Sequence, residues 1–150
     1  MKILVPGRWQ PLHVGHIGLI NQVSEYGQLI IGIGDVPPGP FTYEERRLMF
    51  KKTLPHIDSI TYLQPDDFNL WPKVDMIATG NLDLALSLRE YELAVLLLPE
   101  RRVKRVNSEF DFVSGTLIRD RLNQNQSITG MVSPQIEDLI YHLWKTGNRR

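Results

Sequence analysis

The N-terminal pattern of strand, loop and helix constrains the fold of this chain more than any other stretch. An apolar run at residues 3–5 precedes a loop at residues 7–16, and apolar residues at helical spacing follow at Ile17, Ile20 and Val23. This order predicts a strand, a glycine-bearing loop and the start of a helix. A helix start has unpaired backbone N–H groups and the positive end of the helix dipole, so it attracts phosphate. The sequence therefore predicts an α/β fold that begins with a phosphate-binding turn.

The loop carries side chains that suit a nucleoside triphosphate. Arg8 offers a planar guanidinium that matches phosphate geometry, and Gly15 lets a ligand come close to the backbone. His13 and His16 flank that glycine. One alternative is a turn whose histidines only cap the helix, and another is a zinc site, although no cysteine or third histidine nearby would complete it. We expect these four residues to bind a triphosphate.

The rest of the chain alternates apolar runs with helical patterns. The run at residues 29–34 lacks polar alternation, which predicts a strand covered on both faces, as in a parallel sheet. The alternation predicts an α/β fold with a doubly wound parallel sheet of about five strands and helices on both faces. We expect one Rossmann-like domain over residues 1–150 with a C-terminal helical segment. The expected strands are residues 3–5, 29–34, 59–63, 74–78 and 93–98, and the expected helices begin near residues 17, 41, 82, 114 and 133.

Local signals mark where several of these helices begin and end. Thr42 followed by Glu45 is a capping-box pattern, and Pro55 ends the helix that follows. Ser133 with proline at the next position is a favoured helix start, and Gly147 suits a helix end. The apolar stripe within that last helix predicts core packing.

In a doubly wound sheet, ligands bind at the carboxyl ends of the strands, where the strand order reverses. The loop at residues 7–16 follows the first expected strand, and the turn at residues 79–81 follows a later one. Both would then border one crevice. A basic stretch at residues 101–105 is interpreted as a solvated loop, and residues 114–119 form another helix start.

Composition narrows the classes of partner. The 17 Lys and Arg residues balance the 17 Asp and Glu residues, so the formal net charge is zero. Nucleic-acid coats and membrane-surface proteins have a basic excess that this chain lacks. Cysteine is absent, and no apolar run has the length of a membrane span or of a signal-peptide core. We therefore expect no nucleic-acid partner, no membrane and a cytoplasmic location.

Several segments resemble signatures of one nucleotidyltransferase superfamily. Residues 7–16, GRWQPLHVGH, resemble its GRFQPxHxGH motif, and residues 114–119, SGTLIR, resemble its second motif, SGTxIR. Further matches are IGIG at residues 31–34 and PFTYEERRLM at residues 40–49 with IGIG…PFTxxERxLM, ATGN at residues 78–81 with SGN, and MVSP at residues 131–134 with LVP. Together they resemble the archaeal-type nicotinamide-nucleotide adenylyltransferases more than phosphopantetheine adenylyltransferases or cytidylyltransferases.

The resemblance implies transfer of AMP from ATP to nicotinamide mononucleotide, giving NAD and pyrophosphate. By the same resemblance, His13 and His16 would hold the ATP phosphates, and Arg8 and Arg119 would neutralise charge on the β- and γ-phosphates. Mg²⁺ would be a cofactor carried by the phosphates, with no ligand from a protein side chain. The other ATP-binding positions would be Gly7, Gln10, Gly15, Gly80, Ser114 and Thr116.

On the acceptor side, the resemblance assigns Arg46 to the substrate's phosphate and Trp71 to stacking on the pyridine ring, with Asn69 and Asn81 also binding substrate. The chain departs from the family pattern here, because the loop at residues 35–39 and the aromatic loop are both shorter than usual. Two alternatives stay open: Trp71 as a hydrophobic lid, and Arg46 as a solvated arginine.

Three other functions are alternatives to this one. A sister adenylyltransferase would act on nicotinate mononucleotide or pantetheine phosphate. A non-catalytic nucleotide-sensing module would have lost a phosphate-holding residue, whereas both histidines, Arg8 and Arg119 are present. An aminoacyl-tRNA synthetase fragment would share His-x-Gly-His, but the chain lacks a KMSKS-like lysine loop. Relatives assemble through their outer helices, so we also expect a homo-oligomer.

Overall fold

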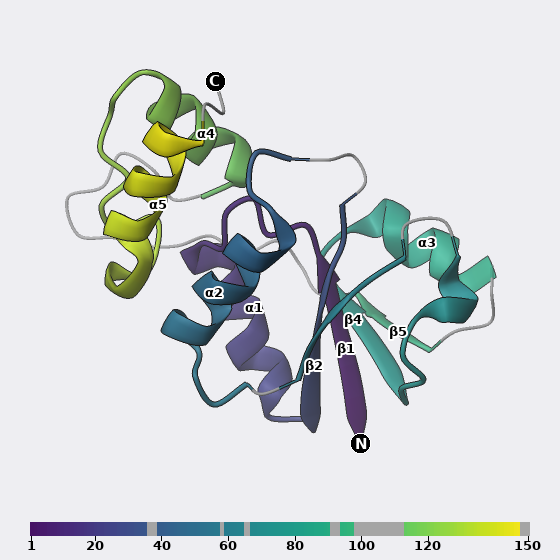
Figure 1. Ribbon diagram of the computed structural model, residues 1–150. Helices are drawn as coiled ribbons and strands as arrows, with labels where there is room; N and C mark the ends of the chain where they lie inside the picture. Colours follow the sequence, from purple (N-terminus) through teal and green to yellow (C-terminus); the bar gives the residue numbers. More distant parts are fainter. Residues whose placement is uncertain (36–38, 58, 65–66, 91–93, 98–112, 148–150) are drawn as a thin grey trace.

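The computed structural model describes residues 1–35, 39–57, 59–64, 67–90, 94–97 and 113–147. Within these ranges, five parallel strands form one sheet in the order β3-β2-β1-β4-β5 (Figure 1). The predicted doubly wound α/β sheet is therefore confirmed. The strands are β1 (Lys2–Gly7), β2 (Gln28–Ile33), β3 (Ile60–Tyr62), β4 (Met76–Thr79) and β5 (Val95–Leu97).

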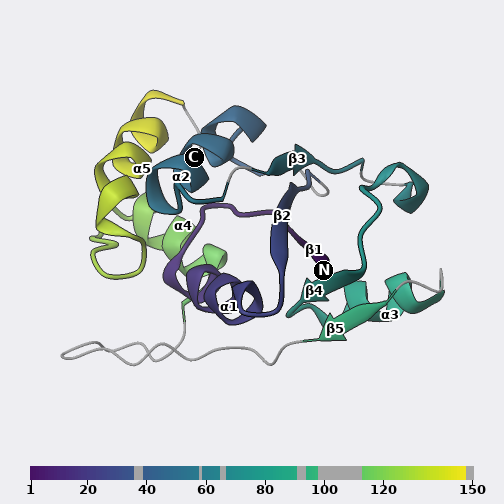
Figure 2. The same cartoon turned by 90° about the horizontal axis from the view of Figure 1, so that it is seen from below.

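Helices cover both faces of the sheet. Figure 2 looks along the sheet and shows α1, α2, α4 and α5 on one side, with α3 on the other. The helices are α1 (Val14–Ser24), α2 (Tyr43–Thr53), α3 (Leu82–Glu90), α4 (Gly115–Asn123) and α5 (Pro134–Thr146), and a short 3₁₀ turn, η1 (Phe68–Leu70), joins β3 to β4. No helix in the described ranges is long and apolar enough to cross a membrane.

The central strand shows why its sequence is apolar without alternation. Ile3 and Val5 pack into the larger core cluster, whereas Leu4 packs into the smaller cluster with Ile77 and Leu88. Successive side chains of a strand point to opposite faces, so β1 is buried from both sides. The buried strand β1 therefore holds the loop at residues 7–16, which follows its carboxyl end, in a fixed position.

The helix boundaries follow the capping signals in the sequence. The Thr42 hydroxyl accepts a hydrogen bond from the Glu45 amide (3.2 Å), and the Glu45 carboxylate accepts one from the Thr42 amide (2.9 Å). Ser133 caps the start of α5 and Gly147 its end. Both capping predictions are confirmed.

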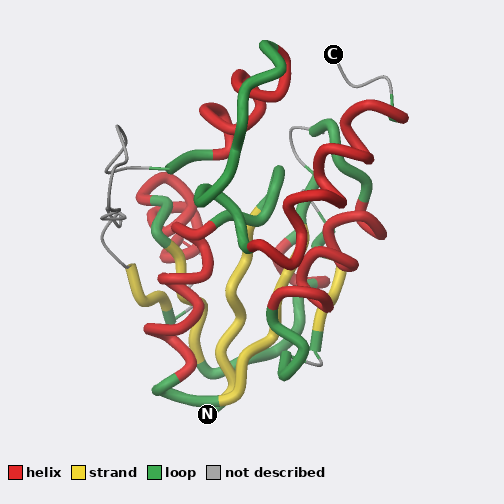
Figure 3. The backbone as a smooth tube through the Cα atoms, turned by 90° about the vertical axis from the view of Figure 1, so that its left-hand side faces the viewer, coloured by secondary structure: helices red, strands yellow, loops and turns green. Residues whose placement is uncertain are grey.

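All five described strands have their amino ends on the side of the sheet where the N-terminus lies, at the bottom of Figure 3. The segments that follow β1, β2 and β4 therefore meet at the carboxyl ends of the strands, on the opposite side. The basic stretch at residues 101–105, and residues 36–38 of the shortened loop, lie outside the described residues.

Candidate active site

A cavity of about 300 Å³ lies beyond the carboxyl ends of β1 and β4. These two strands are neighbours in the sheet. From β1 the chain continues to β2 and β3 on one side, and from β4 it continues to β5 on the other side. The cavity therefore lies where the strand order reverses, which is the usual ligand site of such a sheet. Its lining residues are Val5, Pro6, Gly7, Trp9, His13, Gly15, His16, Leu19, Ala78, Thr79, Gly80, Asn81, Val113, Ser114 and Gly115. The prediction that the first loop and the turn at residues 79–81 border one crevice is confirmed.

The two histidines cap α1 and line the cavity at the same time. His13 Nδ1 accepts hydrogen bonds from the amides of Gly15 (3.1 Å) and His16 (3.4 Å), and His16 Nδ1 accepts one from the His13 amide (3.2 Å). In a neutral imidazole whose Nδ1 is an acceptor, Nε2 carries the proton. Capping therefore leaves each histidine with an Nε2–H donor, so capping and ligand binding are compatible roles for these side chains.

Both imidazoles are neutral near pH 7. Burial lowers the pKa of His13 to about 4. Burial and then the neighbouring His13 hold the pKa of His16 well below its ordinary value. The two rings stack with centroids 3.6 Å apart and an interplanar angle of 18°. The pair therefore offers two fixed, uncharged N–H donors.

A second helix start faces the same cavity. Ser114 is the N-cap of α4, where its hydroxyl accepts a hydrogen bond from the Leu117 amide (3.1 Å). Ser114 and Gly115 line the cavity, whereas Thr116 is exposed and is not part of the lining. Thr116 instead accepts a hydrogen bond from Arg119 (3.3 Å). The amino ends of α1 and α4 thus meet at one cavity and favour an anion there.

Two arginines lie beside this cavity without lining it. A Cβ atom on Gly115 would come within 2.8 Å of Arg119 Nη1, so this guanidinium lies against a lining residue. Burial and then the nearby Arg8 cation lower the pKa of Arg119. Arg8 Nε is buried and has no hydrogen-bond partner among the described residues. An anionic ligand would relieve the repulsion and supply acceptors for both guanidinium groups.

The turn after β4 is held by its own side chains. Thr79 Oγ1 accepts a hydrogen bond from the Asn81 amide (3.0 Å), and Asn81 Oδ1 accepts one from the Leu84 amide (3.0 Å). Gly80 and Asn81 therefore line the cavity on a turn that these hydrogen bonds hold at the start of α3.

Gln10 has a structural role that the sequence did not predict. Its amide oxygen accepts a hydrogen bond from the Phe41 amide (2.9 Å), and its Nε2 donates to the Phe41 carbonyl (3.0 Å). The Gln10 carbonyl accepts from Arg119 Nη1 (2.6 Å). The side chain is buried and does not line the cavity. Gln10 is thus a brace between the motif loop and the segment before α2, and its contact with ATP stays a prediction.

Arg46 is a buried tether between α2 and two loops. It is 0% exposed, so the alternative of a solvated arginine is wrong. Nη1 donates to the carbonyls of Arg8 (2.7 Å) and Gly34 (2.8 Å), Nε donates to the Thr42 carbonyl (3.0 Å), and Nη2 pairs with the Asp35 carboxylate (2.5 Å). These contacts join α2 to the loops after β1 and β2. The predicted contact of Arg46 with a substrate phosphate stays a prediction.

Asn69 and Trp71 lie together in a second cavity of about 350 Å³. Ile77 lines this cavity, whereas the next residue, Ala78, lines the first one. Adjacent strand residues point to opposite faces, so the two cavities lie on opposite faces of the sheet. Trp71 is half-buried, and its Nε1 donates to the Gln64 carbonyl (2.9 Å).

Trp9 lines the first cavity and contacts His16, which the sequence reasoning missed. In the sequence, the position of Trp9 between Arg8 and Pro11 of the motif loop is the signal that could have indicated a role at the site. Among the described residues, no group of three or more His, Cys, Asp or Glu side chains could hold a metal ion.

Comparison with known proteins gives a consistent family. The sequence model of the cytidylyltransferase-like family matches residues 4–121. The nicotinamide-nucleotide adenylyltransferase of Methanococcus vannielii is 31% identical, with 95% of this chain and 90% of that protein covered. The enzyme of the same name from Thermococcus sibiricus is also 31% identical, with 93% of this chain and 83% of that protein covered.

Solved structures support the fold. A putative nicotinate-nucleotide adenylyltransferase from Vibrio parahaemolyticus has a TM-score of 0.58 at 15% identity, with 93% of this chain and 97% of that chain covered. A bifunctional NMN adenylyltransferase/ADP ribose pyrophosphatase from Francisella tularensis has a TM-score of 0.64 at 18% identity, with 97% of this chain and 48% of that chain covered. A second structure of the Francisella protein is complexed with AMP and a manganese ion. By its family match and its sequence relatives, the chain belongs to the nicotinamide-nucleotide adenylyltransferases of the cytidylyltransferase-like family.

Proposed function

We propose that this protein transfers AMP from ATP to nicotinamide mononucleotide, giving NAD and pyrophosphate. Family membership supports the reaction, and the first cavity supports the site. The observation that carries the proposal is the meeting of two helix N-termini and two Nε2–H donors at one cavity. That arrangement suits the polyanionic tail of a nucleoside triphosphate.

The reaction itself demands little covalent chemistry from the protein. A phosphate oxygen of the mononucleotide attacks the α-phosphorus of ATP, and the bond from that phosphorus to the bridging oxygen breaks to release pyrophosphate. The attacking phosphate is already ionised near pH 7, so no strong base is required. Catalysis then depends on alignment and on stabilising the charge of the leaving group.

The described residues fit that task. We assign the Nε2–H groups of His13 and His16 to the triphosphate oxygens, because their Nδ1 atoms are occupied by capping. We assign Arg8 and Arg119 to the β- and γ-phosphates, where negative charge accumulates as pyrophosphate leaves. Ser114 and the start of α4 would add donors, whereas Gly15, whose amide donates to His13 Nδ1, would let the ligand come close to the backbone.

The metal in this proposal is Mg²⁺, which enters with ATP as part of the substrate. The residues that line the first cavity include no Asp or Glu. Mg²⁺ prefers oxygen ligands and commonly binds through substrate phosphates, so phosphate oxygens and water suffice here.

The attacking phosphate of the mononucleotide has to lie at the first cavity, and the contacts of its pyridine ring with Trp71 and Asn69, which line the second cavity, stay predictions. Gly80 and Asn81 line the first cavity, and Asn81 is the predicted substrate contact there. A cytoplasmic location, a homo-oligomer and the absence of nucleic-acid and membrane partners stay predictions.

The direct test is an assay of the purified protein with ATP, Mg²⁺ and nicotinamide mononucleotide, in which NAD is measured by coupled reduction. We expect NAD and pyrophosphate in equal amounts. Nicotinate mononucleotide and pantetheine phosphate are tested in parallel as acceptors. Turnover of one of these alone would assign a sister activity, and ATP binding without pyrophosphate release would assign a sensing module.

A further inference from the structure

Trp9 adopts a backbone conformation that needs support from its surroundings. Its φ is 54°, in the left-handed region that bulky residues rarely occupy. Its side chain is only 3% exposed. Strained residues of this kind persist where neighbouring contacts hold them, and they cluster at functional sites.

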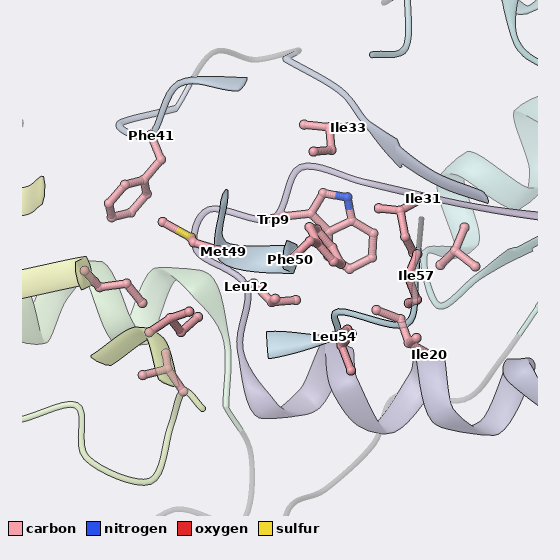
Figure 4. Packing of buried hydrophobic residues seen from close by; sticks show 14 of the residues in the cluster. Trp9, Leu12, Ile20, Ile31, Ile33, Phe41, Met49, Phe50, Leu54 and Ile57 are labelled. Carbon is pink, nitrogen blue, oxygen red and sulfur yellow. The ribbon is translucent and has the colours of Figure 1, made fainter. Parts of the chain in front are cut away.

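Three contacts hold the indole. Its Nε1 donates a hydrogen bond to the Gly32 carbonyl in β2 (2.9 Å). The ring meets the edge of Phe50 with centroids 5.0 Å apart. It also lies over Gly7, where an added Cβ would come within 2.6 Å of the ring, so no other residue fits there without a shift. Figure 4 shows Trp9 among Phe50, Ile31 and Ile33, on the side of the core toward β2.

The fixed indole borders the imidazole of His16. Their centroids are 4.6 Å apart and the planes meet at 75°, a favourable edge-to-face arrangement. His13 stacks against the same imidazole at 3.6 Å, and the Nδ1 edge of His16 is occupied by the His13 amide. The His16 ring is therefore held by contacts with Trp9, His13 and the backbone, which leaves Nε2 as its open polar atom.

We infer that Trp9 is the positioning residue that holds the His16 imidazole at the angle where Nε2–H is directed to the phosphates. This inference rests on the proposed function. The indole acts through His16, while its hydrogen bond to Gly32 ties that geometry to the central sheet. Displacing a phosphate donor by about 1 Å is sufficient to lower a rate strongly.

The kinetic test compares two buried tryptophans. Trp9→Leu removes the ring beside His16, and Trp144→Leu removes an indole that is equally buried in the same core cluster. We expect Trp9→Leu to lower kcat by about 10-fold or more, on the scale that misplaced catalytic groups show. Trp144→Leu should keep the wild-type kcat even though it lowers the melting temperature. Trp9→Phe retains an aromatic ring and should recover most of the lost rate.

The second readout needs no substrate. ¹⁵N–¹H NMR of the histidine side chains reports the tautomer and the pKa of His16 directly. We expect the Nε2–H tautomer with a lowered pKa in the wild type and in Trp144→Leu. In Trp9→Leu the imidazole can turn away from the His13 amide that fixes its tautomer, so the tautomer should be mixed and the pKa should rise toward its ordinary value. Trp9→Met places a longer and more adaptable side chain in the space and serves where the leucine variant does not fold.

Equal kcat values for Trp9→Leu and Trp144→Leu, with an unchanged His16 tautomer and pKa, would overturn the inference and make Trp9 a core residue only. Failure of the wild-type protein to form NAD would instead contradict the proposed function. In that case the NMR comparison would still decide whether Trp9 orients His16.

Discussion

At the scale of single residues, each histidine of the motif uses its two nitrogens differently. Nδ1 accepts backbone hydrogen bonds at the start of α1, and this fixes the proton on Nε2. The pKa values, lowered mainly by burial, keep both rings neutral. The pair thus acts as two oriented donors whose geometry is set before any ligand binds.

His16→Ala removes one of these donors, and we expect it to lower kcat by about 10² or more, the typical scale for loss of one preorganised donor. The fold should survive, because His16 is in the first turn of α1 at a loop surface. Steady-state kinetics with a melting curve check both statements. The matched control is His142→Ala, an exposed histidine on α5, which should leave kcat unchanged. Near wild-type turnover in His16→Ala would contradict the placement of the phosphates.

Arg46→Met removes the buried tether, and we expect a loss of about 2–4 kcal/mol in the free energy of unfolding, because three carbonyls and Asp35 lose their partner. Urea unfolding measures the loss. Arg47→Met, the neighbouring half-buried arginine, serves as control with a small effect. An unchanged stability together with a raised KM for the mononucleotide alone would show that Arg46 binds the substrate phosphate instead.

At the scale of elements, much of the fold could be predicted from the sequence. The capping box of Thr42 and Glu45 and the start of α5 at Ser133 are local patterns, and local hydrogen bonds produce them. The roles of Gln10 and Arg46 could not be predicted. Their partners are backbone groups that approach only when α2 packs beside the loops after β1 and β2. A charged residue in a helix gives no signal of such burial.

The β3–β4 connection carries its own prediction. Trp71 lies in the second cavity, on the other face of the sheet from the histidines. If the pyridine ring stacks on Trp71, Trp71→Ala should raise the KM of the mononucleotide more than the KM of ATP, which initial-rate kinetics with each substrate varied would measure. Phe68→Ala removes the ring that packs edge-on against Trp71 and should show a weaker effect of the same kind. Equal changes in both KM values would make Trp71 a structural lid.

At the scale of the whole molecule, the site joins distant parts of the chain. The hydrogen bond from Arg119 to the Gln10 carbonyl spans 109 positions in the sequence. It brings the start of α4 to the loop that precedes α1. The same two histidines cap α1 and line the cavity. Their protonation state therefore affects both ligand binding and the stability of the fold.

This coupling predicts a pH dependence of stability. The pKa of His13 is about 4 in the folded protein and 6.5 ordinarily, so between these values the unfolded chain binds a proton that the folded chain does not. Stability therefore falls as pH drops below 6.5. His13 alone should contribute a loss of about 2 kcal/mol between pH 7.5 and pH 5, measured by urea unfolding. His13→Asn retains a capping side chain that does not titrate, and it should flatten the curve by that amount.

The central claim is that the loop after β1 and the start of α4 hold one triphosphate together. A crystal structure with α,β-methylene ATP, which cannot transfer AMP, tests this most directly. We predict phosphate oxygens within about 3 Å of Nε2 of both His13 and His16, and within reach of the Arg119 guanidinium. A triphosphate bound in another cavity, or one that contacts neither histidine, would contradict the account.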